Sequence, residues 1–183
     1  MISRTSYEDT HRALVMGCRR GERKAQYGLY QQYAKGMYNL CLRMLGNAHD
    51  AEDVLQVAFV DIFGKIDTFN FESSIGAWIK RVVINRCIDH LKKRRLLTEA
   101  FDMNRHADTP ETVEPEAYDP GYTVEGVKDA MRSLSDGYRV VLSLYLFEGY
   151  DHEEIAKILD ITPSTSKSQY HRAKKRLRQL MVA

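Results

Sequence analysis

The chain has 183 residues, of which 44% are hydrophobic and 28% charged, enough for one medium-sized domain or two small ones. Its formal net charge is only +2, yet residues 96–126 hold eight acidic residues and one basic residue, so the rest of the chain carries +9. A basic body with an acidic segment is typical of a protein that binds a polyanion. Three isolated cysteines exclude a disulfide framework. Without a membrane-length apolar run, the protein is expected to be cytoplasmic and not inserted in a membrane.

Residues 21–95 are predicted to form a helical first domain. Apolar residues three and four positions apart indicate its opening helix: Leu29, Tyr33, Met37, Leu40 and Met44. Gly46 is suited to end this helix, and Asn47 to cap the next one. The second helix carries one apolar stripe: Ala51, Val54, Leu55, Ala58, Phe59 and Ile62. A third helix is predicted to start after Ser73 or Ser74 and to end in the basic run at residues 92–95.

Residues 96–123 are predicted to form an acidic, flexible linker. The segment holds three of the four prolines and shows little hydrophobic periodicity. Such a composition buries too little apolar surface to offset the entropy of ordering, so we expect an extended or disordered chain when the protein is free.

Residues 124–183 are predicted to form a second helical domain that contains a helix-turn-helix. Its first helix is predicted at residues 152–159, the turn at 160–162 and the second helix at 163–180. The two helices share an inward apolar face: Ile155, Ala156, Leu159, Tyr170, Ala173, Leu177 and Leu180. No alternation of apolar and polar residues is long enough to predict a β-strand. The expected fold is therefore all-α, with two small helical domains joined by the linker.

The second helix of the helix-turn-helix is strongly basic, and no acidic residue follows Asp160. Side chains near its start can bond base edges in the major groove of DNA, and later cations can hold phosphates. The candidates are Ser164, Thr165, Lys167, Ser168, Gln169, His171, Arg172 and Lys175. The alternative is a solvated basic helix in an ordinary bundle.

A second polar and aromatic cluster lies at the third helix of the first domain. Aromatic faces beside hydrogen-bonding groups and cations are what an unstacked base needs. The candidates are Phe69, Asn70, Phe71, Ser73, Ser74, Lys80, Arg81 and Arg86. Phe69 is also a candidate for the core, whereas Phe71 is the better candidate for a surface role.

Asp50, Asp53 and Gln56 lie on neighbouring turns at the start of the second helix. Acidic residues there are favoured by the helix dipole, and the same patch could dock a basic protein surface. The histidines lack the spacing of a metal site, and no phosphate loop or nucleophile motif is present. We therefore expect no catalytic residue, no metal and no cofactor.

These residues resemble a known family, the extracytoplasmic-function group of bacterial RNA polymerase sigma factors. Residues 50–59 resemble the D-A-E-D-x-x-Q-x-x-F helix of sigma region 2. Phe69, residues 78–85 and Asp89 resemble the stretch that follows it. The pattern of sigma region 4 is matched by residues of the second domain, namely Leu134, Tyr138, Arg139, residues 154–156, residues 165–168, Arg172 and Ala173. The similarity covers about residues 24–95 and 125–181.

The resemblance implies a promoter-specificity subunit that binds core RNA polymerase, recognises the −35 and −10 elements of promoter DNA and initiates transcription. Asp50, Asp53, Gln56 and Phe59 would dock the polymerase clamp helices. Asn85 would join the cluster from Phe69 to Arg86 in holding the unpaired −10 strand, and the helix from Pro163 would bind the −35 duplex. The linker would thread toward the RNA exit path. An anti-sigma factor is a further expected partner.

Four positions depart from the family pattern. Ser135 stands where a proline is usual, and Asp160 replaces the glycine of the turn. Ser166 replaces an apolar residue, which is expected to loosen packing. Gln169 replaces an arginine, which suggests an altered base preference.

Two other classes of protein remain as alternatives. The first is a stand-alone helix-turn-helix transcriptional regulator, which has no need of a docking helix or a single-strand pocket. The second is an interaction protein with basic surfaces, which would lack salt-dependent affinity for DNA.

Overall fold

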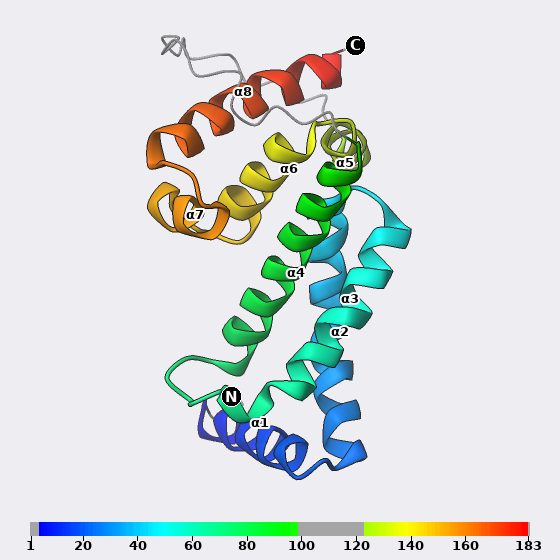
Figure 1. Ribbon diagram of the computed structural model, residues 1–183, viewed down its shortest axis with the longest axis vertical. Coiled ribbons are helices and arrows are strands. Elements are labelled where there is room, and N and C mark those ends of the chain that lie inside the picture. Colours follow the sequence, from blue (N-terminus) through cyan, green and yellow to red (C-terminus); the bar gives the residue numbers. More distant parts are fainter. Residues whose placement is uncertain (1–3, 99–122, 183) are drawn as a thin grey trace. The chain divides into compact units, whose positions relative to one another are not determined.

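The computed structural model describes residues 4–98 and 123–182, and those residues form helices and no strands, which confirms the all-α prediction (Figure 1). By packing, the chain divides into two compact units. The first consists of residues up to Leu42 together with Ala48–Asp89, and the second of Arg43–Asn47 together with residues from His90 onward.

The first unit opens with a helix that the sequence analysis did not identify. Helix α1 (Arg4–Arg19) precedes the expected domain start at residue 21, and Gly21 makes the turn into α2 with a φ of +72°. His11 is buried at 8% exposure and ties α1 to α2 through both ring nitrogens, 2.7 Å from Gln32 Nε2 and 2.8 Å from the Tyr33 hydroxyl. Burial lowers the pKa of His11, so the neutral ring is favoured.

The elements that follow α1 come in the predicted order, and the last residues of α2 and of α4 belong to the second unit. These elements are α2 (Arg23–Leu45), α3 (Ala48–Gly64), the 3₁₀ turn η1 (Ile66–Thr68) and α4 (Ile75–Thr98). Gly46 follows α2 with a φ of +72°, as expected for a helix end, and the predicted apolar stripe of α3 is buried. Ser74 caps α4, since its hydroxyl accepts a hydrogen bond from the Ala77 amide at 3.2 Å.

Two cysteines that are distant in sequence meet in this core. The Sγ atoms of Cys41 and Cys87 lie 3.7 Å apart, and both residues are fully buried. The hydrogen bond to Cys41, and then burial, raises the pKa of the Cys87 thiol. A protonated, buried thiol is a poor nucleophile, which supports a packing role for the pair.

The predicted linker, 96–123, lies largely at residues 99–122, outside the described residues. At its edges the structure differs from the expected boundaries. Helix α4 continues to Thr98, and Thr123 is the N-cap of α5 (Val124–Arg132), with its hydroxyl 3.1 Å from the Gly126 amide.

The second unit continues with α6 (Asp136–Leu142), a π-helical turn at Ser143–Phe147, α7 (His152–Leu159) and α8 (Pro163–Val182). Leu134, Leu142 and Ala173 form a buried cluster against the predicted inward face of α8. Arg139, only 4% exposed, closes the corner between α5 and α6 by donating to the carbonyl of Leu134 at 2.7 Å and pairing with Asp136. Ser135 occupies the N-cap of α6, but its side chain makes no capping hydrogen bond.

Candidate nucleic-acid interfaces

The helix-turn-helix has the predicted elements, with α7 and α8 joined by a short turn (Figure 1). Asp151 and Glu154 form a reciprocal capping box at the start of α7. Asp160 ends α7 in the left-handed conformation, with a φ of +57°, which an aspartate tolerates better than most residues. The Thr162 hydroxyl then caps α8 by accepting from the Thr165 amide at 3.0 Å. Capping at both helix starts fixes the angle at which α8 leaves the turn.

One face of α8 is exposed along its length. Between Ser164 and Lys175 the exposed residues recur three or four positions apart, and they are Ser164, Lys167, Ser168, His171 and Lys175. Thr165, Gln169 and Arg172 lie beside this stripe and are half-buried, and the Thr165 hydroxyl lies 2.8 Å from that of Thr162. All the predicted duplex-binding residues therefore fall on or next to one surface, the α8 stripe.

Ser166 does not loosen the packing, contrary to expectation. Its side chain is fully buried, and its hydroxyl lies 2.9 Å from Nδ1 of His152 on α7. The His152 ring in turn stacks on Tyr145, with centroids 4.7 Å apart, and meets the edge of Tyr170. The polar residue thus has a polar partner, and the pair joins the two helices of the motif.

Burial lowers the pKa of His152, and the charges of Lys167 and His171 act in the same direction, against a smaller opposing effect of Asp151. The ring is therefore neutral in the folded state near pH 7.

The loop between η1 and α4 divides the predicted −10 residues between core and surface. Phe69 is only 3% exposed and packs against Phe71 and Trp78, with centroids 4.9 Å and 5.7 Å away. Placing Phe69 at a nucleic-acid surface was therefore wrong, because its ring belongs to the core. Asn70 and Ser73 are exposed, whereas the Ser74 hydroxyl is used as the α4 cap.

Phe71 is the half-buried aromatic residue of this loop. Its φ is +63°, a left-handed conformation that a phenylalanine rarely adopts. Two arginines of α1 lie over its ring, with the guanidinium carbons of Arg12 and Arg19 at 4.6 Å and 5.2 Å from the centroid. Arg19 also donates a hydrogen bond to the Phe69 carbonyl. Neither arginine could be predicted from the sequence, because nothing in the periodicity of the chain places α1 against this loop.

The basic face of α4 is smaller than predicted. Arg81 and Asn85 are exposed and Lys80 is half-buried. Arg86 forms an ion pair with Asp61 of α3 and lies 3.6 Å from Asp89. The charge of Arg86 therefore helps to pack α3 on α4, and its role in DNA binding stays a prediction. At the far end of α4, Lys92 and Lys93 are exposed.

The predicted docking face of α3 also needs one correction. Asp53 and Gln56 are exposed, and they lie beside two exposed valines, Val57 and Val60, at 52% and 72% exposure. Asp50 is half-buried at the start of the helix. Phe59 is only 3% exposed and packs against Tyr30 and Phe63, so it cannot contact a partner. The apolar periodicity that put Phe59 in the core was the better guide.

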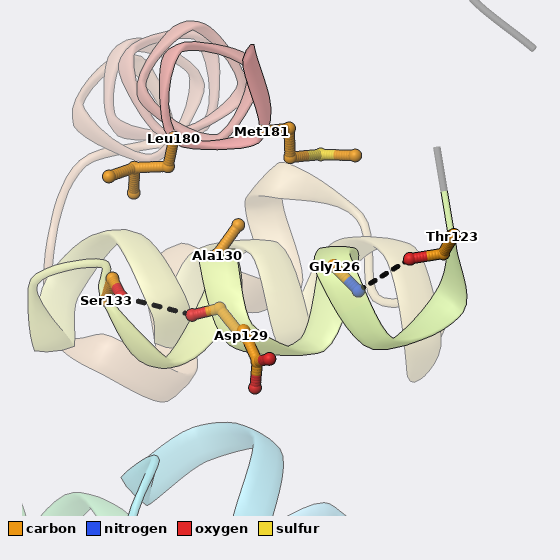
Figure 2. A pocket seen from close by; sticks show the side chains of 7 residues that line it. All are labelled: Thr123, Gly126, Asp129, Ala130, Ser133, Leu180 and Met181. Carbon is orange, nitrogen blue, oxygen red and sulfur yellow. Dashed lines mark hydrogen bonds between the residues drawn. The ribbon is translucent and has the colours of Figure 1, made fainter. Parts of the chain in front are cut away.

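A hollow of about 330 Å³ lies between α5 and the end of α8 (Figure 2). Its lining comprises Thr123, Gly126, Asp129, Ala130, Ser133, Leu180 and Met181. The one carboxylate in this lining, Asp129, pairs with Arg132 at 2.7 Å, and Ser133 donates to the Asp129 carbonyl. Nothing in this lining suits a particular ligand. Within the described residues, no group of three or more His, Cys, Asp or Glu could hold a metal ion.

None of the helices in the described part of the chain is both long and apolar enough to cross a membrane.

Family models match both units. The model described as Sigma-70 region 2 matches residues 29–96, and that of Sigma-70, region 4 matches residues 125–177, together about two thirds of the chain. The first match contains α3, the Phe71 loop and most of α4. The second contains α7 and α8 as far as Leu177.

Characterised relatives and a solved structure agree with these matches. The chain is 28% identical to the ECF RNA polymerase sigma factor SigW of Bacillus subtilis, over 88% of this chain and 91% of that protein. It is 29% identical to the ECF sigma factor SigM of the same species, over 83% and 92%. The fold is similar to that of the sigma factor RpoE of Bartonella quintana, solved in complex with the anti-sigma factor NepR. There the TM-score is 0.59 at 22% identity, over 86% of this chain and 96% of that one.

Proposed function

The chain belongs to the extracytoplasmic-function group of the sigma-70 family, and we propose from this premise how its residues divide the work of promoter recognition. As a sigma subunit it binds core RNA polymerase, recognises the −35 and −10 elements and initiates transcription. Members of the family are non-enzymatic regulators, and we assign the chemistry of RNA synthesis to the polymerase alone. Residues 21–95, with α1 added, form the −10 and polymerase-binding domain in this proposal, and residues 124–183 form the −35 domain.

The α8 stripe reads the −35 element as duplex. Ser164, Lys167, Ser168 and His171 can donate or accept at base edges, since the start of a recognition helix enters the major groove. Arg172 and Lys175, further along, would hold phosphates, which supplies affinity without sequence information. Gln169 and Thr165 lie at the edge of the stripe and would set preferences at neighbouring positions.

The Phe71 loop binds the unpaired non-template strand of the −10 element. Its half-buried ring offers a stacking surface, and exposed Asn70 and Ser73 offer hydrogen bonds beside it. Lys80, Arg81 and Asn85 on α4 would follow the strand backbone. Unstacking and unpairing a base costs a few kcal/mol, and the binding of the unstacked bases to the protein offsets this cost and so drives melting.

The exposed face of α3 docks the polymerase. Acidic and amide groups at Asp53 and Gln56 lie next to the apolar surface of Val57 and Val60, a mixture typical of protein interfaces. Asp50, half-buried at the helix start, completes the polar edge of this face.

The linker and the regulation of the protein complete the proposal. The acidic linker, which lies outside the described residues, would occupy a basic channel on the RNA exit path until RNA displaces it. An anti-sigma factor is proposed as a partner, by likeness to the complex in which the sigma factor RpoE was solved. The protein would act in the cytoplasm, where the polymerase is.

The observation that carries the proposal is the presence of the docking face and the Phe71 loop in one chain with a helix-turn-helix. A stand-alone regulator, which binds duplex DNA only, needs neither of the first two, and that alternative is not favoured.

The test is transcription reconstituted with core RNA polymerase on a genomic promoter library. Start sites should appear only when the protein is added, and Asp53→Arg should abolish them together with polymerase binding. Glu125→Arg, which makes the same charge change on exposed α5, should leave both intact. Retained duplex binding without any polymerase binding by the wild-type protein would overturn the proposal.

A further inference from the structure

We propose that Arg12 and Arg19 of α1 belong to the −10 strand site, Arg12 as a contact to the nucleotide stacked on Phe71 and Arg19 as the residue that positions the loop. The inference rests on the proposed role of the Phe71 loop. It adds to that loop a helix, α1, that the family model for region 2, residues 29–96, does not reach.

Arg19 holds the backbone of the loop. Its guanidinium donates to the carbonyl of Phe69 and lies 3.5 Å from that of Asp67, and its side chain is 25% exposed. These bonds fix the chain just before Phe71 from a helix about fifty residues away. The hydrogen bonds of Arg19 therefore attach the loop to α1.

The backbone conformation of Phe71 depends on these contacts between α1 and the loop. A left-handed φ of +63° is strained for a phenylalanine and persists only where the surroundings fix it. The surroundings are Phe69 on one side and the two guanidinium groups on the ring. The strain presents an aromatic ring at the surface of the loop instead of letting it join the core, as Phe69 does.

Arg12 has the exposure that a nucleotide contact requires. Its side chain is exposed, and its guanidinium lies over the Phe71 ring at 4.6 Å. A base that stacks on this ring would share its surface with Arg12 and would bring its own phosphate close to the guanidinium. A planar guanidinium can stack on a base or bind a phosphate with two hydrogen bonds. When a nucleotide binds, Arg12 can therefore replace its contact with the Phe71 ring by a contact with the base or its phosphate.

The experiment measures binding of a single-stranded −10 oligonucleotide to reconstituted holoenzyme at several salt concentrations. The probe is the non-template strand of a start site found in the transcription experiment above, with 2-aminopurine at each −10 position in turn. The variants are Arg12→Gln, Arg12→Lys and Arg19→Gln. The control is Arg20→Gln, which removes the same charge from the adjacent position, where the arginine pairs with Glu22 at 2.6 Å.

Arg12→Gln should weaken binding about tenfold and make the slope of log K against log salt shallower by about 0.7, the value for one single-strand phosphate contact. Arg12→Lys should keep the slope. Arg19→Gln should weaken binding about fivefold with the slope unchanged, because it disorders the loop without touching the strand. Arg20→Gln should match the wild type, and the melting temperatures of all four variants should agree to within a few degrees.

Equal binding and equal slopes for Arg12→Gln and Arg20→Gln would overturn the role of Arg12. An Arg19→Gln variant that binds like the wild type would overturn that of Arg19. Failure of the wild-type holoenzyme to bind the strand at all would overturn the role of the Phe71 loop itself, and is thereby distinguished from failure of this inference.

Discussion

The Phe71 loop and helix α8, the two surfaces that we propose bind nucleic acid, are built in opposite ways. On α8 the polar and basic groups share one exposed face of a regular helix that is capped at its start and packed through Ala173 and Leu177. In the loop, one aromatic ring is held in a strained backbone conformation by arginines from another helix. A rigid helix suits a groove whose shape is already present in duplex DNA. A strained loop suits a base that must first leave the stack.

The contrast predicts that the two surfaces can be disabled separately. The substitutions below attack one surface while leaving the other, and they run from the largest expected effect to the smallest.

Replacing Phe71 should cause the largest loss. Phe71→Gly removes the stacking ring but also removes the left-handed strain, so the free energy of unfolding should change little. Since a base on an aromatic ring contributes about 1–3 kcal/mol, single-strand binding by the holoenzyme should fall about 5- to 150-fold. Phe71→Tyr, which keeps the ring, should bind within about threefold of the wild type. A Phe71→Gly variant with full promoter melting, measured by permanganate reactivity, would break the comparison.

Removing the Ser166 hydroxyl should destabilise the helix-turn-helix. Ser166→Ala leaves Nδ1 of His152 without this bond and should cost about 1 kcal/mol in the free energy of unfolding, measured by thermal and urea denaturation. Ser168→Ala, an identical change at an exposed position of the same helix, is the control and should be close to neutral. Equal stability of the two variants would show that the buried pair adds nothing.

Removing a phosphate-binding cation from α8 should reduce the salt dependence of duplex binding. Lys175→Gln should make the slope of log K against log salt for duplex binding shallower by about 0.9, because this lysine is proposed to hold one phosphate. Fluorescence anisotropy on a −35 duplex measures this slope, and single-strand binding should not change. An unaltered slope together with a changed sequence preference would place Lys175 on a base edge instead.

Acid should destabilise the second unit by a small amount through His152. The pKa of this ring is lowered in the fold from 6.5, so the unfolded chain binds more protons at mildly acid pH. Its contribution is fully present above about pH 6.5 and is lost as the pH falls through the lowered folded pKa. Melting temperatures between pH 8 and pH 5 should therefore fall less in His152→Gln than in the wild type. His49→Gln, at an exposed position, should follow the wild type.

The sequence predicted what depends on local pattern. Helices α7 and α8, the turn at Asp160 and the stripe of α3 follow from apolar spacing and capping residues that lie within a few positions of each other. Their side-chain environments therefore follow from the period of the helix alone.

Most of what the sequence did not predict involves partners distant in sequence. Arg86 is paired with Asp61, 25 residues away, and Ser166 with His152, 14 residues away. Arg19 reaches the Phe69 carbonyl across 50 residues. No periodicity encodes such pairs, so the ion pair of Arg86 was not predicted and Ser166 was assigned to loose packing on its polarity alone. Phe59 was misplaced for a different reason. It was assigned to docking because it belongs to the family motif, although the apolar spacing of α3 already placed it in the core.

The separation of the two surfaces is tested most directly by one paired measurement. Holoenzymes carrying Phe71→Gly or Lys167→Gln would each be titrated with a −35 duplex and with a −10 single strand in the same buffer. The account predicts that Phe71→Gly weakens only single-strand binding and that Lys167→Gln weakens only duplex binding. A parallel loss of both affinities in either variant would contradict it.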